Sequence, residues 1–467
     1  MKSIALYASV TSLLLMAAAL ILTPHAAAQP ARDRPPNLII ILTDDQGYAD
    51  VGFNGCKDIP TPHIDRIANE GVRFPNGYVS YSVCGPSRAG LITGRYQDRF
   101  GGSRNPTIDP SVPNNGVPRS EQNIAELLKP MGYATMAVGK WHLGTYPDLR
   151  PRVRGFDEFY GFLSGGHDYF PEKLTLESLE DVETQWGWYR TKLLHNGQRV
   201  ATTRYLTDEL SDKAVDFVER KRNEPFFLYL AYNAPHTPMQ ATEPYLARFP
   251  HIENERRRTY AAMIAAVDDG VGRLLDKLDE HGLDEDTIVF FLSDNGGAHN
   301  NASYNGPLRG QKGSYYEGGL RVPFAARWTG VFPAGMDYDH PIIALDIAGT
   351  IVGQSGATVS SQRPLDGVDL TPYLAGDIEG PPHRQLFWRS YDGGWVATRR
   401  GDDKYIAGKK GREFFRLAED VGESTNQADA ASADIAALEP ALNDWLEGLI
   451  PPISPPLNSW QPKKKNN

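Results

Sequence analysis

The chain contains very little cysteine: Cys56 and Cys84 are the only two in 467 residues. Two cysteines allow one disulfide at most, which excludes a cysteine framework as the basis of the fold. Stability must come from a hydrophobic core, and a chain of this length can bury a large one. Hydrophobic residues make up 40% of the sequence and charged residues 23%, as in ordinary globular proteins.

Positive charge is also scarce. The 48 lysine and arginine residues are outnumbered by 58 aspartate and glutamate residues, which gives a net charge of -10. We therefore expect no nucleic-acid partner, because nucleic acid is bound by basic surfaces. Net charge says little about a single pocket, so an anionic ligand would require cations that gather locally.

Long apolar runs are lacking outside the first residues. The only run near membrane-spanning length covers residues 4–22, follows Lys2 and precedes three alanines that end at Ala28. This pattern predicts a secretory signal peptide over residues 1–28, and hence a periplasmic or secreted protein. An uncleaved membrane anchor is the alternative, since the run approaches spanning length. After cleavage we expect no stable membrane insertion.

The rest of the chain has the pattern of an α/β protein. Apolar runs alternate with amphipathic helices, which is typical of a mostly parallel sheet covered by helices. The clearest helix is predicted over residues 258–281, where an apolar stripe at helical spacing ends before Gly282. A shorter helix is predicted from Thr61 to Ala68. Uninterrupted apolar runs indicate strands buried on both faces. They cover residues 37–42, 133–138, 226–232 and 287–292.

Changes in composition predict three parts after the signal peptide. A catalytic domain is predicted over residues 29–371. Short aromatic-rich segments then follow, such as residues 385–391 and 395–398. They predict a small antiparallel sheet with a terminal helix, which together form an α+β subdomain over residues 372–460. The lysine-rich residues 461–467 are predicted to be a disordered tail.

Acidic and amide side chains follow two of the predicted strands. Asp44 and Asp45 come after the first strand, and Asp294 and Asn295 come after another strand about 250 residues later. Open α/β sheets place their sites at the carboxyl ends of the strands. Three carboxylates and one amide oxygen form a hard ligand set, suited to calcium or magnesium rather than zinc.

The run Ser82–Arg95, SVCGPSRAGLITGR, is the most informative stretch of the chain. It resembles the signature of type I, formylglycine-dependent sulfatases of the alkaline phosphatase superfamily, Cys-x-Pro-Ser-Arg followed by Leu, Thr, Gly and Arg. Residues 44–52 and 293–296 resemble the metal motifs of the same family. The resemblance implies an alkaline phosphatase-like fold, a large, mostly parallel mixed sheet sandwiched by helices, with a small C-terminal antiparallel-sheet subdomain.

The same resemblance implies how Cys84 is used. In this family a formylglycine-generating enzyme, a maturation partner, oxidises the cysteine to formylglycine, and the hydrated aldehyde attacks the sulfur of the substrate. Cys56 would then remain as a free thiol. One calcium ion is implied, with magnesium as the less favoured alternative. The implied metal ligands are Asp44, Asp45, Cys84, Asp294 and Asn295.

Cationic and histidine side chains occur in further segments that resemble the family. Arg88, one helical turn after Cys84, is implied to hold the nucleophile. Lys140 is implied to bind the sulfate and His142 to contact the nucleophile, and both side chains reach one side if this segment is extended. His236 is implied as the general acid for the leaving group, and Lys312 as a ligand of the sulfate and of the bridging oxygen.

The substrate implied by the resemblance is a sulfated carbohydrate. Residues 155–170 look like the corresponding segment of sulfatases that act on algal galactans such as carrageenan, and His167 in this segment is implied to lie at the sulfate rim. Glycosaminoglycans, mucin glycans and aryl sulfates remain open. The aromatic residues Trp186, Trp188 and Tyr189 indicate either a sugar platform or an inserted hydrophobic flap.

Two other functions remain open from the sequence. One is an enzyme of the same superfamily that hydrolyses phosphate diesters or phosphonate monoesters with the same nucleophile. The other is a non-catalytic protein that binds sulfated glycans and keeps Cys84 as a thiol. The hypothesis that best fits all the motifs is a sulfuric ester hydrolase.

Overall fold

The computed structural model describes residues 34–184 and 186–456. The predicted signal peptide and the predicted tail lie outside the described residues. Among the described residues, no helix combines the length and the apolar character needed to cross a membrane.

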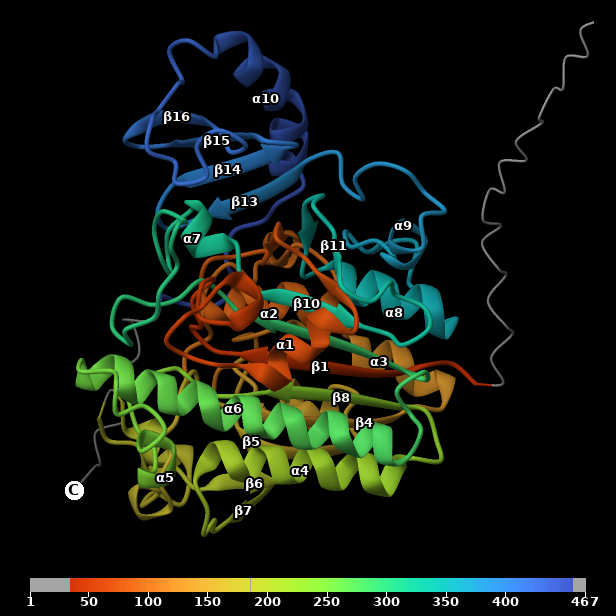
Figure 1. The fold of residues 1–467 in the computed structure, drawn as a ribbon, viewed down its shortest axis with the longest axis vertical. Helices are drawn as coiled ribbons and strands as arrows, with labels where there is room; N and C mark the ends of the chain where they lie inside the picture. Colours follow the sequence, from red (N-terminus) through yellow and green to blue (C-terminus); the bar gives the residue numbers. More distant parts are fainter. Residues whose placement is uncertain (1–33, 185, 457–467) are drawn as a thin grey trace, which may run out of the picture. The chain divides into compact units, whose positions relative to one another are not determined.

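A ten-stranded mixed sheet forms the centre of the fold (Figure 1). The strand order is β11-β2-β10-β9-β1-β8-β4-β5-β6-β7. The five central strands pair in parallel. They are β9 (Thr287–Ser293), β1 (Asn37–Thr43), β8 (Phe226–Ala231), β4 (Ala134–Lys140) and β5 (Glu158–Phe162). The outer strands, most of them antiparallel, are β10 (Phe324–Arg327), β2 (Val72–Arg73), β11 (Met336–Asp337), β6 (Leu193–His195) and β7 (Gln198–Val200).

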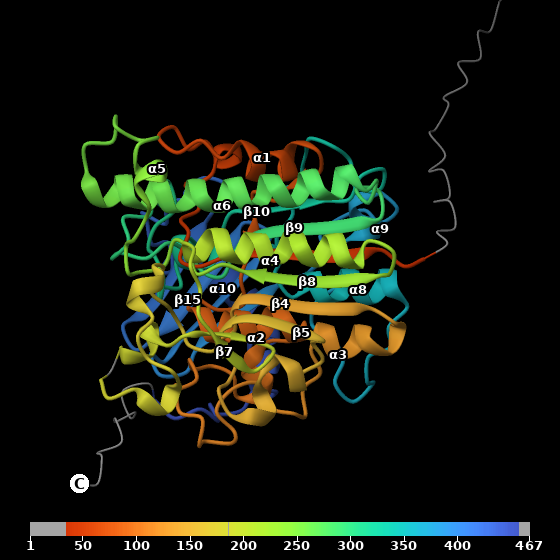
Figure 2. The ribbon, with the colours of Figure 1, turned by 90° about the horizontal axis from the view of Figure 1, so that it is seen from below.

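Helices cover both faces of this sheet (Figures 1 and 2). One face packs against α1 (Pro62–Asn69), α4 (Leu206–Lys221) and α6 (Glu255–Glu280). The other packs against α2 (Cys84–Thr93), α3 (Ile124–Leu128) and α8 (Asp346–Ser355). β1 contributes Leu38, Ile40 and Leu42 to one core and Ile39 and Ile41 to the other. Its uninterrupted apolar run therefore serves two helical layers, as the sequence predicted.

The long helix α6 confirms the predicted stripe and begins three residues earlier than predicted. All six stripe residues, from Tyr260 to Leu278, are at most 1% exposed. The side chain of Asn254 caps the helix by accepting a hydrogen bond from the Arg257 amide at 2.9 Å. Gly282, with a φ of 62°, follows the last turn.

A separate four-stranded antiparallel sheet lies toward the C-terminus, in the order β13-β14-β15-β16. The predicted small antiparallel sheet with a terminal helix is thereby confirmed; the boundary predicted near residue 372 stays a prediction. Trp388 is fully buried, and its indole nitrogen donates to the backbone oxygen of Val79 at 2.7 Å. These elements are β13 (Leu386–Ser390), β14 (Trp395–Arg400), β15 (Asp403–Gly408), β16 (Gly411–Arg416) and α10 (Ser432–Glu447).

Shorter elements complete the fold. They are β3 (Gly77–Tyr78), β12 (Ile342–Ile343), α5 (Glu243–Leu246), α7 (Glu317–Leu320) and α9 (Thr371–Leu374). Two of them, β3 and β12, pair in parallel as a two-stranded sheet. The strand β5 was not predicted, because its sequence EFYGF is short and contains a glycine, which is more typical of a loop than of a strand.

Candidate active site

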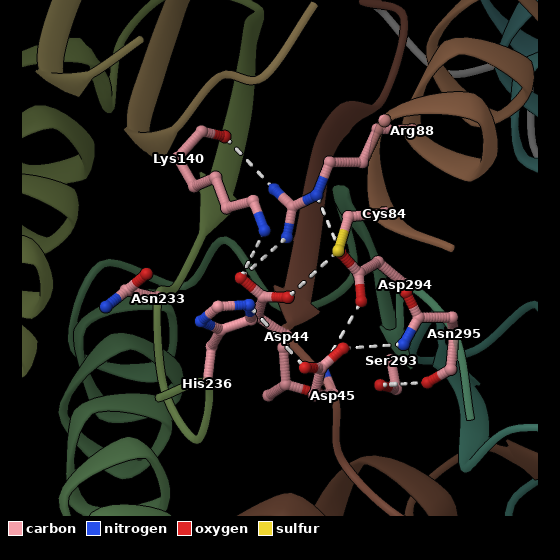
Figure 3. A network of polar contacts seen from close by, with 12 residues as sticks. Asp44, Asp45, Cys84, Arg88, Lys140, Asn233, His236, Ser293, Asp294 and Asn295 are labelled. Carbon is pink, nitrogen blue, oxygen red and sulfur yellow. Dashed lines mark hydrogen bonds and ion pairs between the residues drawn. The ribbon is translucent and has the colours of Figure 1, made fainter. Parts of the chain in front are cut away.

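The predicted site residues gather where the parallel strands of the central sheet end (Figure 3). Parallel strands share one direction, so their carboxyl ends meet at one edge and bring distant segments together. Asp44 and Asp45 follow β1, and Asp294 and Asn295 follow β9. His236 follows β8, and His142 follows β4.

The acidic residues and Cys84 form one buried group. Ligand atoms of Asp44, Asp45, Cys84 and Asp294 all lie within 4.8 Å of one another. Asn295 Nδ2 donates to Asp45 Oδ1 at 2.7 Å, whereas Asn295 Oδ1 is buried and accepts no hydrogen bond from a described residue. An acceptor buried without a partner is costly. The oxygen donors and this orphaned oxygen fit a hard divalent cation such as calcium or magnesium.

Burial and crowding shift the pKa values of these carboxyl groups. Burial alone would raise the pKa of Asp44, but Lys140 and the other neighbouring cations hold it well below its usual range. Burial together with the charge of Asp44 raises the pKa of Asp294 to about 6, against the effect of Arg88. Carboxylates this close repel one another, and a cation among them relieves the repulsion.

Cys84 is the first residue of α2 and is only 2% exposed. Its Sγ lies 3.2 Å from Lys312 Nζ and 3.6 Å from Asp44 Oδ1. Burial raises the pKa of the thiol to about 12, so the unmodified side chain is protonated at neutral pH. The N-terminus of α2 favours negative charge on residue 84. Pro86 lies in the first turn of α2, where its missing N–H leaves no helical hydrogen bond unmade.

Two lysines pair with the acidic group. Lys140 Nζ lies 2.5 Å from Asp44 Oδ2, and both side chains are fully buried. Lys312 Nζ lies 2.6 Å from Asp45 Oδ1. Burial works against charge on Lys312, but Asp45 and the other anionic groups raise its pKa well above the ordinary value. Lys312 therefore stays charged beside Cys84.

Arg88 joins two of the segments that form the site. Its Nε donates to Asp294 Oδ2 at 2.7 Å, and its Nη1 donates to the backbone oxygen of Lys140 at 3.1 Å. Its Nη2 is buried, lies 3.8 Å from Asp44 Oδ2 and has no hydrogen-bond partner among the described residues. One guanidinium donor therefore remains free for an anion, since an arginine presents five N–H groups.

His142 reaches the site through a backbone that differs from the predicted one. β4 ends at Lys140, and His142 has a φ of 56°, so the segment is not extended here. The ring lines the cavity, and its buried Nδ1 has no hydrogen-bond partner among the described residues. Burial and the charge of Lys140 lower the pKa of His142 well below its usual value. Gly165 leaves room for the ring, since a Cβ there would lie 2.7 Å from its Cε1 atom.

His236 lies on the opposite side of the acidic group from Arg88 (Figure 3). Its Nδ1 is 2.6 Å from the backbone oxygen of Thr237. A carbonyl only accepts, so Nδ1 carries a proton and Nε2 is left for other partners. Nε2 lies 3.6 Å from Asp45 Oδ2. Burial lowers the pKa of His236, although Asp44 and Asp45 oppose this shift.

A cavity of about 450 Å³ adjoins these groups, a size that suits a small-molecule ligand. The residues Arg88, Lys140 and Asp294 are buried and do not line it. Five of the predicted site residues do face it, namely Asp45, Cys84, His142, His236 and Lys312.

His167 is not brought to this cavity. It is fully buried and stacks on Phe162, with ring centroids 4.7 Å apart. Its Nε2 lies 2.7 Å from the backbone oxygen of Thr191, and its Nδ1 lies 2.9 Å from that of Asp168. Burial lowers the pKa of His167 to about 4, so the neutral ring donates to one of these two carbonyl oxygens. Because the ring is buried and does not line the cavity, we do not carry the implied substrate-binding role forward. The sequence shows a histidine beside glycines but cannot show which groups occupy its nitrogens.

Three asparagines contribute contacts that the sequence analysis missed. Asn105 Oδ1 accepts from the Gly85 amide at 2.8 Å at the start of α2, and Asn105 lines the cavity. Asn301 Nδ2 donates to the backbone oxygen of Asp45 at 3.0 Å. Asn233 donates to the backbone of His167 and keeps a buried Oδ1 without a partner among the described residues. Asparagine is common in loops, so no sequence signal marks these three.

Comparisons with known proteins agree with this geometry. The family model described as Sulfatase matches residues 36–357. The chain is 34% identical over 404 residues to N-acetylgalactosamine-6-sulfatase of Homo sapiens, a match that covers 79% of this chain and 74% of the relative.

Two solved structures are also similar. Ps i-CgsB in complex with k-i-k-neocarrahexaose has a TM-score of 0.85 and 39% identity, covering 92% of this chain and 96% of that chain. The PsFucS1 sulfatase from Pseudoalteromonas sp. has a TM-score of 0.76 and 26% identity, covering 89% and 90%.

Proposed function

Since the chain belongs to the sulfatase family and is a sulfuric ester hydrolase, we propose that it removes sulfate from a polysaccharide or its oligosaccharides. An algal galactan such as carrageenan is the favoured substrate. The likeness to Ps i-CgsB, which was crystallised with a neocarrahexaose, supports this choice because it extends over 92% of the chain. The proposal includes conversion of Cys84 to formylglycine and the binding of one calcium ion.

The observation that carries the proposal is the position of Cys84. It starts α2, contacts Lys312 and Asp44, and faces the cavity. Formylglycine at this position would supply a hydrated aldehyde, of which one hydroxyl attacks sulfur and the other later expels sulfate. A buried thiol with a pKa of about 12 is a poor nucleophile, which supports the need for this modification.

The calcium ligands we propose are Asp44, Asp45, Asp294, Asn295 and residue 84. Bound calcium would act as a Lewis acid toward the sulfate. The chain's own cations complete the anion site. Arg88 Nη2 has a free donor, Lys312 stays charged beside residue 84, and Lys140 pairs with Asp44. A sulfate monoester carries its negative charge on oxygens around the sulfur, so donors placed around the group stabilise charge that develops there.

His236 is the proposed general acid. Its Nδ1 donates to the Thr237 carbonyl, so the acid is the doubly protonated ring, a form that the charges of Asp44 and Asp45 favour. Nε2 would then transfer its proton to the departing oxygen, which leaves the ring neutral. His142, whose Nδ1 lacks a partner, is proposed to bond a hydroxyl of residue 84. These two histidines would thus act on different oxygens of the reaction.

The maturation and location of the protein belong to the same proposal. A formylglycine-generating enzyme would act on the segment around Cys84 before the chain folds, because the folded thiol is only 2% exposed. We further propose that the chain is periplasmic or secreted after loss of residues 1–28. The domain limits at residues 371 and 372 are proposed with it.

A phosphonate monoester hydrolase remains the second candidate of the same fold. The enzyme of that name from Agrobacterium radiobacter has a TM-score of 0.63 at 20% identity, which supports the fold alone. A non-catalytic glycan-binding protein is the third candidate. Such a protein would keep Cys84 as a thiol.

Sulfate release by protein matured with formylglycine-generating enzyme tests the proposal, with conversion of Cys84 confirmed by mass spectrometry. The panel holds carrageenan oligosaccharides, glycosaminoglycans, an aryl sulfate and a phosphate diester. We expect release from a glycan and its loss in Cys84→Ala. Turnover of the diester without any sulfate release would show that the protein is a phosphodiester or phosphonate hydrolase. Conversion of Cys84 without turnover of any substrate would favour the non-catalytic glycan-binding protein.

A further inference from the structure

One wall of the cavity consists of aromatic side chains that the reaction at sulfur does not use. Trp186, Trp188 and Tyr189, here called the aromatic wall, all line the cavity. The ring centroid of Trp186 lies 5.3 Å from that of Trp188 and 5.9 Å from that of Tyr189. The three rings thus form one contiguous aromatic surface.

Packing explains Trp188 but leaves Trp186 without a structural role. Trp188 is 5% exposed and belongs to a small hydrophobic cluster with Ile108, Leu179 and Val182. Trp186 is 55% exposed, and unlike an isolated surface side chain it lines the cavity together with two other aromatic rings. The inserted hydrophobic flap that the sequence also allowed would account for the buried ring of Trp188 but not for the exposed ring of Trp186. The exposed ring of Trp186, which lines the cavity, is available to contact a ligand.

Backbone hydrogen bonds hold the C-terminal end of the aromatic wall. The backbone oxygen of Tyr189 accepts from the Asp168 amide at 2.9 Å, and that of Arg190 accepts from the Leu176 amide at 2.9 Å. His167 Nε2 lies 2.7 Å from the Thr191 oxygen, directly after the wall. A surface fixed by these bonds is preorganised for binding, which lowers the entropic cost of association.

The inner end of the wall adjoins the proposed general acid. The ring of Tyr189 lies 6.4 Å from that of His236, in an edge-on arrangement. Gly166 permits this placement, because a Cβ there would lie 2.6 Å from the Tyr189 ring. The wall therefore starts at the leaving-group side of the sulfate and continues outward to Trp186.

The rest of the cavity lining mixes apolar side chains such as Ile108 with neutral polar ones and carries few charges. It includes the amides of Asn105 and Asn300 and the ring of His299. Among the described residues that line the cavity, Lys312 is the only lysine or arginine. A space with an aromatic surface and neutral polar groups matches a pyranose, which has an apolar C–H face and hydroxyls on its edge.

We propose that the aromatic wall is the binding site for the sugar on the leaving-group side, with Trp186 stacked on a pyranose ring. This inference rests on the proposed function and names the groups that recognise its substrate. A fused apolar ring system such as a steroid is disfavoured, because it would leave the polar lining unpaired.

The test compares matured wild type with Trp186→Ala and Trp186→Phe, using k-i-k-neocarrahexaose as the substrate. We expect Trp186→Ala to raise KM about tenfold and to change kcat by less than about twofold, since the lost contact acts on binding. Trp186→Phe should keep most of the affinity. Ile378→Ala, a truncation of another exposed apolar side chain that does not line the cavity, serves as the control.

Direct binding separates sugar recognition from chemistry. In a Cys84→Ala background, the desulfated hexaose should bind measurably by calorimetry, and Trp186→Ala should weaken it about tenfold. The loss should be the same at low and at high salt, because the contact is uncharged. An unchanged KM, or a loss confined to kcat, would overturn the inference.

Failure of the proposed function gives a different result. In that case the wild type itself would release no sulfate from the hexaose or from the glycosaminoglycans, while an aryl or steryl sulfate is turned over. Sulfate release from the hexaose by wild type, with equal KM in Trp186→Ala, would refute the aromatic-wall inference alone.

Discussion

At the scale of single residues, the carboxamide of Asn295 distinguishes between two explanations of the acidic group, a metal site and a set of ion pairs. Ion pairs alone explain the lysines and carboxylates, but they do not explain a buried amide oxygen without a donor. Calcium would supply the missing partner, since it accepts amide and carboxylate oxygens together.

Asn295→Ala should therefore weaken calcium binding about tenfold or more, because even contacts outside the ligand shell contribute that much in metal sites. The measurement is the rise in Tm on addition of calcium chloride to chelator-treated protein, which does not depend on activity. Asn443→Ala, at an exposed position of α10, is the control. An equal calcium-induced rise in Tm in the wild type, Asn295→Ala and the control variant would show that Asn295 is not a calcium ligand.

Gly165 sets the position of His142 without taking part in the chemistry. A Cβ at this position would lie 2.7 Å from Cε1 of His142, so Gly165→Ala must displace the ring. We expect kcat to fall about tenfold or more, as misplaced catalytic groups do at shifts of about 1 Å. Gly422→Ala, where the nearest atom is 3.4 Å away, should leave kcat unchanged. Equal kcat values would show that His142 tolerates displacement.

At the scale of elements, the start of α8 is held by one ion pair. Asp346 accepts from the Ile343 and Val368 amides, and its Oδ1 lies 2.7 Å from His383 Nε2. Burial alone would lower the pKa of His383, but the carboxylate of Asp346 raises it above the ordinary value. The charged histidine therefore stabilises the folded state.

The sign of the pH dependence follows from this raised pKa. A group whose pKa is raised on folding contributes fully below its unfolded value, near 6.5, and the contribution is lost as the pH rises through the folded value. His383→Gln should thus cost most stability near pH 6 and progressively less above pH 7. Urea denaturation of both proteins across this range measures it. A difference that grows with pH would contradict the assigned ion pair.

The elements that carry the site follow from local pattern to different degrees. β1, β9 and α6 were predicted within a few residues, because strands buried on both faces and a long amphipathic helix have strong periodic signals. His142 was expected in an extended segment, yet its backbone is left-handed and its ring lies against Gly165, a contact that local pattern does not reveal. His167 and Asn105 depend on partners far along the chain, which periodicity does not reveal.

At the scale of the whole molecule, the C-terminal sheet is joined to the loop that carries Lys312. Glu317 opens α7, five residues after Lys312, and is fully buried. Lys404 Nζ on β15 lies 2.8 Å from Glu317 Oε1 and 2.8 Å from Glu423 Oε1. Glu423 Oε2 also accepts from the Glu317 amide at 2.7 Å. The sequence predicted the second sheet but not this buried contact.

Lys404→Met should leave Glu423 without its lysine partner beside a second buried carboxylate, that of Glu317, which keeps Arg321 and Arg399 at 3.5 and 3.8 Å. Breaking a buried pair in this way costs about 3–5 kcal/mol, so we expect a lower urea midpoint together with a lower kcat. The neighbouring surface variant Lys409→Met should change neither value. The double variant Lys404→Met, Glu423→Gln should recover part of the stability, because it removes one of the stranded charges. Full activity in the destabilised single variant would show that the C-terminal sheet supports the fold but does not position the Lys312 loop.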